Sequence, residues 1–304
     1  MDRGGDIVYD RGESEAWAMN FRTDVFSAEP VGDGLLKIQG SGCVYCFLAI
    51  GTKRALLVDT MSGLGNLHSF VRTLTDLPLT VVCTHVHFDH IGGAMDFPVV
   101  WLPQEDSFLM MDHVGIDRRF GLEQKVCSFR HVPIHFSQGD FTPPGKTVWK
   151  HLPHGTIFDL GGRVLETISV PGHTPGSVGL LDSKTGCFIS GDAGSRFTFM
   201  FLDCSTSVEV YLDALLNLKS HWGDRISCWL NAHNEAVLPP GILDDLIDCC
   251  HDALEGRVKG PLFREKDTQD WQFVHPIDKR WRRTDGKVGN VIIRRSSLSC
   301  LRSL

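Results

Sequence analysis

The sequence predicts an α/β protein, of the α+β kind, in which two sheets are covered by helices on their outer sides. Short apolar stretches typical of strands are followed by longer stretches whose apolar residues recur at helical spacing. Both halves of the chain contain both patterns, which indicates two layers of sheet rather than separate all-β and all-α parts. The apolar fraction of 42% against 22% charged residues is enough for one sizeable core.

The first half begins with a polar lead-in, residues 1–30. Three strand-like stretches follow, punctuated by Gly and by Lys or Arg, which predicts antiparallel hairpins. A helical spacing of apolar residues comes next, and then two short buried strands. These elements are the strands 35–38, 44–50 and 55–58, the helix 62–77, and the strands 80–83 and 99–102.

The second half begins after an irregular insert, residues 112–155, which contains several prolines and aromatic side chains. We expect the strands 156–160, 164–170, 178–181 and 187–190, the helix 207–222, the strand 226–230 and the helix 243–254. Residues 258–304 are basic. We therefore interpret 31–257 as one domain that carries the insert, and 258–304 as a basic C-terminal appendage.

Composition argues against several classes of protein. Thirty Lys and Arg against 37 Asp and Glu give a formal charge of −7, which argues against a nucleic-acid partner. The longest clean apolar run is 43–50, whereas a transmembrane helix needs about 20 residues. No apolar segment follows the charged N-terminus, so we expect no secretory signal. The ten scattered cysteines suggest a reduced, cytoplasmic protein, and the basic appendage leaves a weak contact with a membrane surface open.

The most informative motif is Thr84-His85-Val86-His87-Phe88-Asp89-His90. Three His and one Asp fall within six residues, directly after a buried strand. Imidazole and carboxylate groups are ligands that zinc and similar metals prefer. The motif therefore predicts a metal site.

Three more metal-capable side chains follow apolar strands. His173 lies in a Pro-Gly-His turn, Asp192 follows Ser190-Gly191, and His233 follows Asn231-Ala232. Polar side chains at strand ends can turn toward a common site from irregular backbone. We expect these three residues to complete the metal site.

This pattern resembles the metallo-β-lactamase superfamily over residues 31–257. The resemblance implies a four-layer αββα sandwich with two Zn²⁺ ions per chain, iron or manganese being alternatives. It implies a first zinc site of His85, His87 and His173, a second site of Asp89, His90 and His233, and Asp192 as the bridging carboxylate. Asp59 corresponds to the family's strand-end Asp that supports the motif loop from outside the ligand set.

The sequence departs from the family at four places. Ala232 precedes His233, at a position where the family commonly has Gly. Met61 follows Asp59-Thr60, at the position of the glycine in the family's usual Asp-Thr-Gly. Asp192 replaces the Cys or Ser of the antibiotic-degrading members, which argues against a dedicated β-lactamase. No Tyr follows Asp192 closely, unlike in many lactonases of the family; the chain's tyrosines are Tyr9, Tyr45 and Tyr211.

The resemblance implies a dinuclear zinc-dependent hydrolase in which a metal-bound hydroxide attacks an acyl carbonyl and Asp89 orients the nucleophile. The Gly161-Gly162-Arg163 segment and the Pro-Gly-His-Thr-Pro-Gly-Ser turn resemble a subgroup of acyl-thioester hydrolases, which implies a small-molecule substrate such as long-chain acyl-CoA. Lactone, β-lactam or phosphodiester hydrolysis at the same site is an alternative, as is a non-catalytic metal-binding scaffold. The aromatic residues of the insert could hold an acyl chain or fold the insert against the core. The sequence identifies no substrate-binding residue and no oligomeric state.

Overall fold

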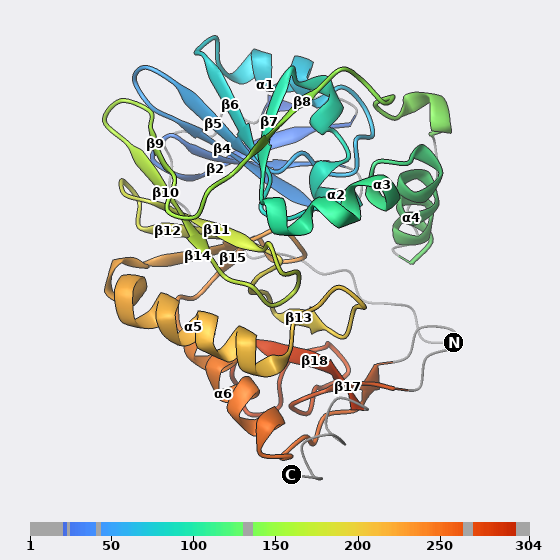
Figure 1. Cartoon of the computed structure of the whole chain (residues 1–304), viewed down its shortest axis with the longest axis vertical. Coiled ribbons are helices and arrows are strands. Elements are labelled where there is room, and N and C mark those ends of the chain that lie inside the picture. The colour runs from blue at the N-terminus through green and yellow to red at the C-terminus, as the bar shows by residue number, and fades with distance from the viewer. Residues whose placement is uncertain (1–20, 23–24, 41–43, 130–135, 264–269, 296–304) are drawn as a thin grey trace, which may run out of the picture.

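The computed structural model describes residues 21–22, 25–40, 44–129, 136–263 and 270–295 (Figure 1). Most of the predicted lead-in, residues 1–20, and the end of the predicted appendage, residues 296–304, lie outside this part. Cys43, which forms a Cys-x-x-Cys pattern with Cys46, also lies outside it.

The first sheet follows the order of the sequence. Its first five strands are antiparallel hairpins, as the Gly and Lys or Arg punctuation predicted, and its last four strands run parallel to each other. The strands are β1 (Phe21–Arg22), β2 (Ser27–Gly32), β3 (Leu35–Gln39), β4 (Tyr45–Ile50), β5 (Ala55–Val58), β6 (Leu79–Val82), β7 (Val99–Leu102) and β8 (Val148–His151). Three helices lie on this half: α1 (Leu67–Leu74), α2 (Phe88–Ile91) and α3 (Met110–His113).

The second sheet belongs to the second half of the chain. Its order is β15-β14-β12-β11-β10-β9, with β12 and β14 parallel. The strands are β9 (Ile157–Asp159), β10 (Val164–Ser169), β11 (Val178–Asp182), β12 (Cys187–Gly191), β14 (Cys228–Asn231) and β15 (Val237–Leu238). Two long helices, α5 (Val208–Trp222) and α6 (Ile242–Leu254), pack on its outer face (Figure 1).

The two sheets pack face to face. Along β4, Phe47 points into the core between the sheets, whereas the neighbouring Cys46 and Leu48 point toward the helices of the first half. This alternation follows from the two-residue period of a strand, and every residue from Tyr45 to Ala49 is buried because both faces are covered. Leu180, Ile189 and Leu230 of the second sheet complete the central core. The predicted four-layer αββα sandwich is confirmed.

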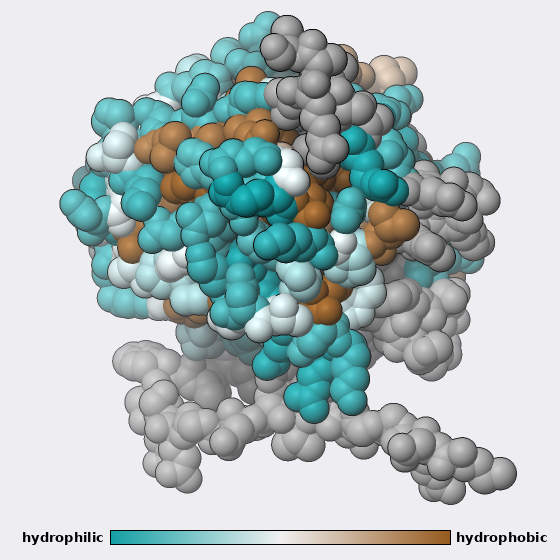
Figure 2. All heavy atoms as spheres, turned by 90° about the horizontal axis from the view of Figure 1, so that it is seen from below, coloured by the Kyte–Doolittle hydropathy of each residue, from teal (hydrophilic) through white to brown (hydrophobic). Residues whose placement is uncertain are grey.

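A third sheet, which the sequence did not predict, lies beside the second half. Its order is β13-β18-β17-β16, from β13 (Phe197–Met200), β16 (Leu262–Phe263), β17 (Trp271–Phe273) and β18 (Asn290–Arg294). Strand β18 is parallel to β13, and its residues Val291 and Ile293 pack with α5 and α6. The segment that the sequence analysis described as a basic appendage is thus packed into the fold over its described part. Seen from the side of α6, this half is covered mainly by hydrophilic side chains at its centre (Figure 2).

The insert also joins the fold closely. It contains the helix α4 (Ile116–Phe129) and the edge strand β8. The helix α4 contacts α2 and α3. Phe120, Phe136 and Phe141 contact each other edge to face, and Phe141 is buried. These contacts favour the interpretation that these aromatic residues fold the insert against the core. Among the described residues, no helix is both long and apolar enough to cross a membrane.

Candidate metal centre

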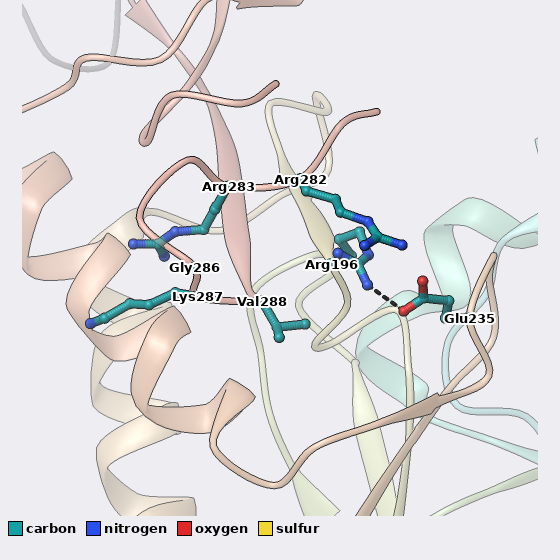
Figure 3. Close-up of a pocket in the computed structure, with 7 residues that line it drawn as sticks. All are labelled: Arg196, Glu235, Arg282, Arg283, Gly286, Lys287 and Val288. Atoms are coloured by element: carbon teal, nitrogen blue, oxygen red, sulfur yellow. Dashed lines mark hydrogen bonds and ion pairs between the residues drawn. The ribbon is translucent and has the colours of Figure 1, made fainter. Parts of the chain in front are cut away.

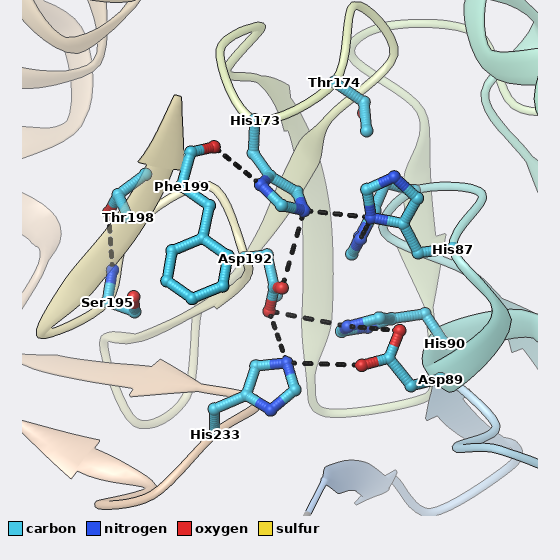
Figure 4. Close-up of polar contacts among 12 residues, drawn as sticks. His87, Asp89, His90, His173, Thr174, Asp192, Ser195, Thr198, Phe199 and His233 are labelled. Atoms are coloured by element: carbon cyan, nitrogen blue, oxygen red, sulfur yellow. Dashed lines mark hydrogen bonds and ion pairs between the residues drawn. The ribbon is translucent and has the colours of Figure 1, made fainter. Parts of the chain in front are cut away.

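The ends of four strands carry the predicted ligands, which lie close together (Figure 4). The His-rich motif follows β6, and its last two members, Asp89 and His90, lie on the short helix α2. His173, Asp192 and His233 come shortly after β10, β12 and β14. The structure therefore brings together all seven side chains that the sequence singled out.

Potential ligand atoms of these residues lie very close to one another. His87 Nδ1 is 3.0 Å from His85 Nε2 and 2.9 Å from His173 Nε2. Asp192 lies between the groups: its carboxylate oxygens are 3.5 Å from His173 Nε2 and 3.1 Å from His233 Nε2. The side chains form three groups that could each hold a metal ion: His85, His87 and His173; His85, His90 and Asp192; and Asp89, His90 and His233.

In three of the histidines, the ring nitrogen that faces away from the centre forms a hydrogen bond. His173 Nδ1 donates to the Phe199 carbonyl at 2.9 Å, and His90 Nδ1 donates to Asp59 at 2.9 Å. His85 Nδ1 lies 3.1 Å from Thr84 Oγ1, which itself donates to Asp59. Such contacts fix the tautomer and leave each Nε2 with a lone pair toward the centre. Asp59 thus supports the motif loop, in the role that the resemblance implied.

The donor set fits a bound cation. Among the described residues, His90 Nε2 and Asp192 Oδ1 are buried polar atoms without a hydrogen-bond partner. An unsatisfied buried group costs about 1–3 kcal/mol, and a cation would remove that cost. Burial keeps the pKa of His85 and His87 well below the usual value, so both imidazoles are neutral and able to coordinate. Burial acts on His90 in the same direction, but Asp59, Asp192 and Asp89 together raise its pKa.

Glycines let the strand ends approach each other. A Cβ on Gly191, which has φ +53°, would lie 2.3 Å from Thr84 Oγ1. A Cβ on Gly92 would lie 2.2 Å from the Ser62 carbonyl oxygen. A larger residue at either place would push the motif loop away from its neighbours.

Sequence reasoning missed a buried carboxylate that connects the two ligand loops. Asp106 accepts hydrogen bonds from Val86 N–H at 3.1 Å, from Gly176 N–H at 2.7 Å and from the Thr174 hydroxyl at 2.7 Å. Val86 lies between His85 and His87, and Thr174 follows His173. Asp106 stands in an ordinary polar run of the sequence, which gave no signal of its burial.

Two further contacts of His87 were also missed. His113, from the insert, stacks on the His87 ring at 4.9 Å and accepts a hydrogen bond from Phe88 N–H through Nδ1 at 3.1 Å. Burial lowers the pKa of His113 to about 4, so it is neutral and can accept. Cys204 Sγ lies 3.6 Å from His87 Nε2, and burial raises its pKa to about 11. Both residues limit the rotation of the His87 ring.

Comparisons with known proteins identify relatives of this chain. The chain is 28% identical over 181 residues to the acyl-coenzyme A thioesterase MBLAC2 of Gallus gallus, which covers 55% of this chain and 65% of that protein. The human protein of the same name is 26% identical over 184 residues, covering 55% and 66%. The hydroxyacylglutathione hydrolase GloC of Haemophilus influenzae is 30% identical over 147 residues, covering 46% and 61%. The chain thus spans just under two thirds of the length of these relatives.

Solved structures share the fold at low identity. A metallo-beta-lactamase superfamily protein of Sulfolobus tokodaii matches with a TM-score of 0.51 at 16% identity, over 78% of this chain and 91% of that chain. The sec-alkylsulfatase Pisa1 of Pseudomonas matches with a TM-score of 0.55 at 14% identity, over 76% and 42%. The family model of the metallo-beta-lactamase superfamily matches residues 42–227. The chain belongs to the metallo-β-lactamase superfamily.

Proposed function

We propose that this protein is a dinuclear zinc hydrolase that cleaves acyl thioesters, with long-chain acyl-CoA as the substrate class. The observation that carries the proposal is the convergence of five histidines and two aspartates in a chain whose curated relatives include acyl-coenzyme A thioesterases. In this proposal His85, His87 and His173 hold one ion and Asp89, His90 and His233 hold the other. Asp192, which lies between the two groups, bridges them.

Two zinc ions bound here would act as a Lewis acid on the acyl carbonyl. They would also make hydroxide available at neutral pH, since zinc lowers the pKa of bound water to about 7. Asp89 is the catalytic residue of the proposal. Its Oδ2 is 3.6 Å from His233 Nε2 and its side chain is 16% exposed, so it can orient an attacking water and accept its proton at a carboxylate oxygen. Asp59 and the Phe199 carbonyl keep His90 and His173 oriented throughout.

The leaving group favours a thioester over a lactone. A thiol has a pKa of about 8.5, so a thiolate departs without a strong general acid, whereas an alkoxide needs a proton. Both described tyrosines already donate their hydroxyl to backbone: Tyr45 to the Asn234 carbonyl and Tyr211 to the Ala193 carbonyl, each at 2.6 Å. Neither tyrosine is therefore free to act as the acid for an alkoxide.

The test is metal analysis combined with a substrate panel. We expect two zinc ions per chain, and the highest kcat/KM on palmitoyl-CoA among palmitoyl-CoA, S-lactoylglutathione, an acyl-homoserine lactone, nitrocefin and bis(p-nitrophenyl) phosphate. Chelation with EDTA followed by gel filtration should abolish turnover, and added zinc should restore it. Full activity after chelation would contradict the metal mechanism, and no turnover of any substrate would favour the scaffold alternative.

A ligand variant and a matched control sharpen this test. His87→Ala should abolish turnover and leave the fold intact by circular dichroism. His151→Ala removes an exposed imidazole on the edge strand β8 and should leave turnover unchanged. Equal activity of the two variants would overturn the assignment of His87.

We also propose a reducing compartment such as the cytoplasm. All eight described cysteines are free thiols, and most are buried. Thiols persist in a reducing environment, and no residue of the proposed mechanism is a cysteine.

A further inference from the structure

A shallow pocket, open to solvent, lies near the metal-ligand loops. Its volume is about 400 Å³, and it is lined by the loop after Asp192, the loop after His233 and residues 282–288 of the C-terminal segment (Figure 3). The lining includes Arg196, Glu235, Arg282, Arg283 and Lys287. Arg282 lies next to Arg196 and Glu235, whereas the ends of the Arg283 and Lys287 side chains point to the other side (Figure 3). Four of these five charged side chains are cations.

The chemistry of this cavity differs from that of the molecule as a whole. The chain carries a formal charge of −7, but residues 279–287 contain five basic residues and one acidic residue. A local excess of positive charge on an acidic protein attracts an anionic ligand to that place. We propose that this cavity, here called the basic pocket, binds the phosphate groups of the thiol carrier, as in the nucleotide end of a coenzyme A thioester. The inference rests on the proposed thioesterase function.

Arg282 is the exposed cation of the pocket that is available to bind an anion. Arg196 pairs with Glu235, Arg283 with Asp285 and Lys287 with Asp248. No carboxylate in the described part of the chain forms an ion pair with Arg282, whose side chain lies next to that of Arg196 (Figure 3). Exposed ion pairs such as that of Lys287 contribute little stability, so Lys287 can exchange its partner for a phosphate. Guanidinium groups bind phosphate oxygens through two parallel hydrogen bonds.

A strained turn presents Arg282 to the pocket. Trp281 has φ +61°, a left-handed conformation that costs about 1–2 kcal/mol for a residue with a side chain. The Asp278 carboxylate holds the turn by accepting hydrogen bonds from the N–H groups of Arg280 at 2.8 Å and Arg282 at 2.9 Å. The Trp281 ring packs edge to face on Phe197 and Phe273, both at 6.0 Å between ring centroids. The turn thus fixes the place from which Arg282 extends.

The basic pocket lies within reach of the metal centre. Glu235 is two residues after His233, which limits their Cα separation to about 7 Å, and Arg196 is four residues after Asp192, which limits theirs to about 14 Å. If the nucleotide is bound in the pocket, the flexible pantetheine arm can extend from it and place the thioester at the metal ligands. The pocket would therefore recognise the leaving group and not the acyl chain.

The experiment compares two thioesters that share an acyl group. Octanoyl-CoA carries the phosphates, and S-octanoyl-N-acetylcysteamine lacks them. For Arg282→Gln in the zinc-loaded protein we expect the ratio of kcat/KM between the two substrates to fall about tenfold, the effect of losing one charge-assisted hydrogen bond. Arg280→Gln is the matched control, because Arg280 lies in the same turn but does not line the pocket. An equal fall in both variants would overturn the inference, because it would mean that the overall positive charge of the segment, and not a contact from Arg282, attracts the phosphates.

A binding measurement separates this inference from the proposed function. Adenosine 3′,5′-bisphosphate, the phosphate-bearing part of coenzyme A, should bind the wild type in calorimetry, and Arg282→Gln should weaken that binding at least several-fold. If the protein cleaves no thioester but this difference persists, the proposed function fails and the pocket remains a phosphate site. If it cleaves both thioesters equally well and the bisphosphate does not bind, the function stands and the inference is wrong.

Discussion

At the scale of single residues, the ligands and their supports differ in how visible they are in the sequence. The seven candidate ligands follow apolar strands, and the period of a strand and the turn residues after it mark where such side chains gather. Asp106, Arg119 and His113 are also buried, but none of them belongs to a motif or directly follows a strand-like run. A single buried polar residue has no period, so one sequence cannot reveal it.

Asp106 gives the first residue-scale prediction. Its carboxylate accepts three hydrogen bonds that join the loop of His85 and His87 to the loop of His173. In Asp106→Asn an NH₂ group replaces one of the two accepting oxygens. This NH₂ group then faces a group that also donates, so buried N–H or O–H groups lose their acceptor. We expect zinc affinity to fall about 10–100-fold, as for the loss of an outer contact that orients a ligand.

Competition with a fluorescent zinc chelator measures this effect. Glu105→Gln is the control, because it neutralises the neighbouring carboxylate, which is exposed and pairs with His154 at the surface. Zinc affinity equal to that of wild type in Asp106→Asn would show that the two loops hold the ligands without this carboxylate.

Met61 illustrates a departure from the family that the structure explains. It occupies the position where the family commonly has Gly, and its φ is +55°, a conformation that glycine adopts without cost. The side chain is 5% exposed and packs in the core of the first half. Its burial offsets the backbone strain, so Met61 packs in the core and does not need to line the site.

At the scale of elements, local patterns predicted most strands but not their distant pairings. The strands around β4, β10 and β12 and the helices α5 and α6 follow from apolar period and turn residues. The pairing of β18 with β13 joins segments about ninety residues apart in the sequence, and nothing local marks it. The basic character of residues 258–304 suggested a solvated segment, although Val291, Ile292 and Ile293 within it are buried.

The helix α4 carries the element-scale prediction. Arg119, on its first turn, is fully buried and donates to the carbonyls of Gly92 at 2.8 Å, Ser62 at 3.3 Å and Thr142 at 2.7 Å. It therefore ties the insert to the end of α2 and to the loop after β5. Arg119→Gln should lower the free energy of unfolding by about 3 kcal/mol, because buried carbonyls lose hydrogen bonds to a charged donor.

Urea unfolding of Arg119→Gln and Arg118→Gln side by side measures this difference. Arg118 is the adjacent residue of the same helix and is exposed, so its loss should change the free energy of unfolding by less than about 0.5 kcal/mol. Coinciding unfolding curves for the two variants would mean that the insert is held to the domain by its apolar contacts alone.

At the scale of the whole molecule, one buried arginine connects the two halves of the sandwich. Arg163 at the start of β10 lies 3.3 Å from Asp182 at the end of β11, and both side chains are essentially inaccessible. The Arg163 guanidinium also donates to the backbone carbonyls of Asp33, Gly34 and Ile50 in the first sheet. The second half thereby holds the hairpin ends of the first sheet.

Removing this arginine should therefore destabilise the whole domain. Arg163→Met leaves the Asp182 charge buried without its partner and removes one donor from each of three backbone carbonyls, so we expect a loss of about 3–5 kcal/mol in the free energy of unfolding. Asp182→Asn in the Arg163→Met background should cost less than Asp182→Asn alone, because the charge that needs compensation is gone.

Arg225→Met is the control. Arg225 pairs with Glu166 of strand β10 at 3.0 Å, but this pair lies at the surface, and such pairs contribute about 0–1 kcal/mol. Guanidinium unfolding followed by both circular dichroism and zinc release measures all four variants, and equal losses for Arg163→Met and Arg225→Met would show that central apolar packing alone joins the two halves.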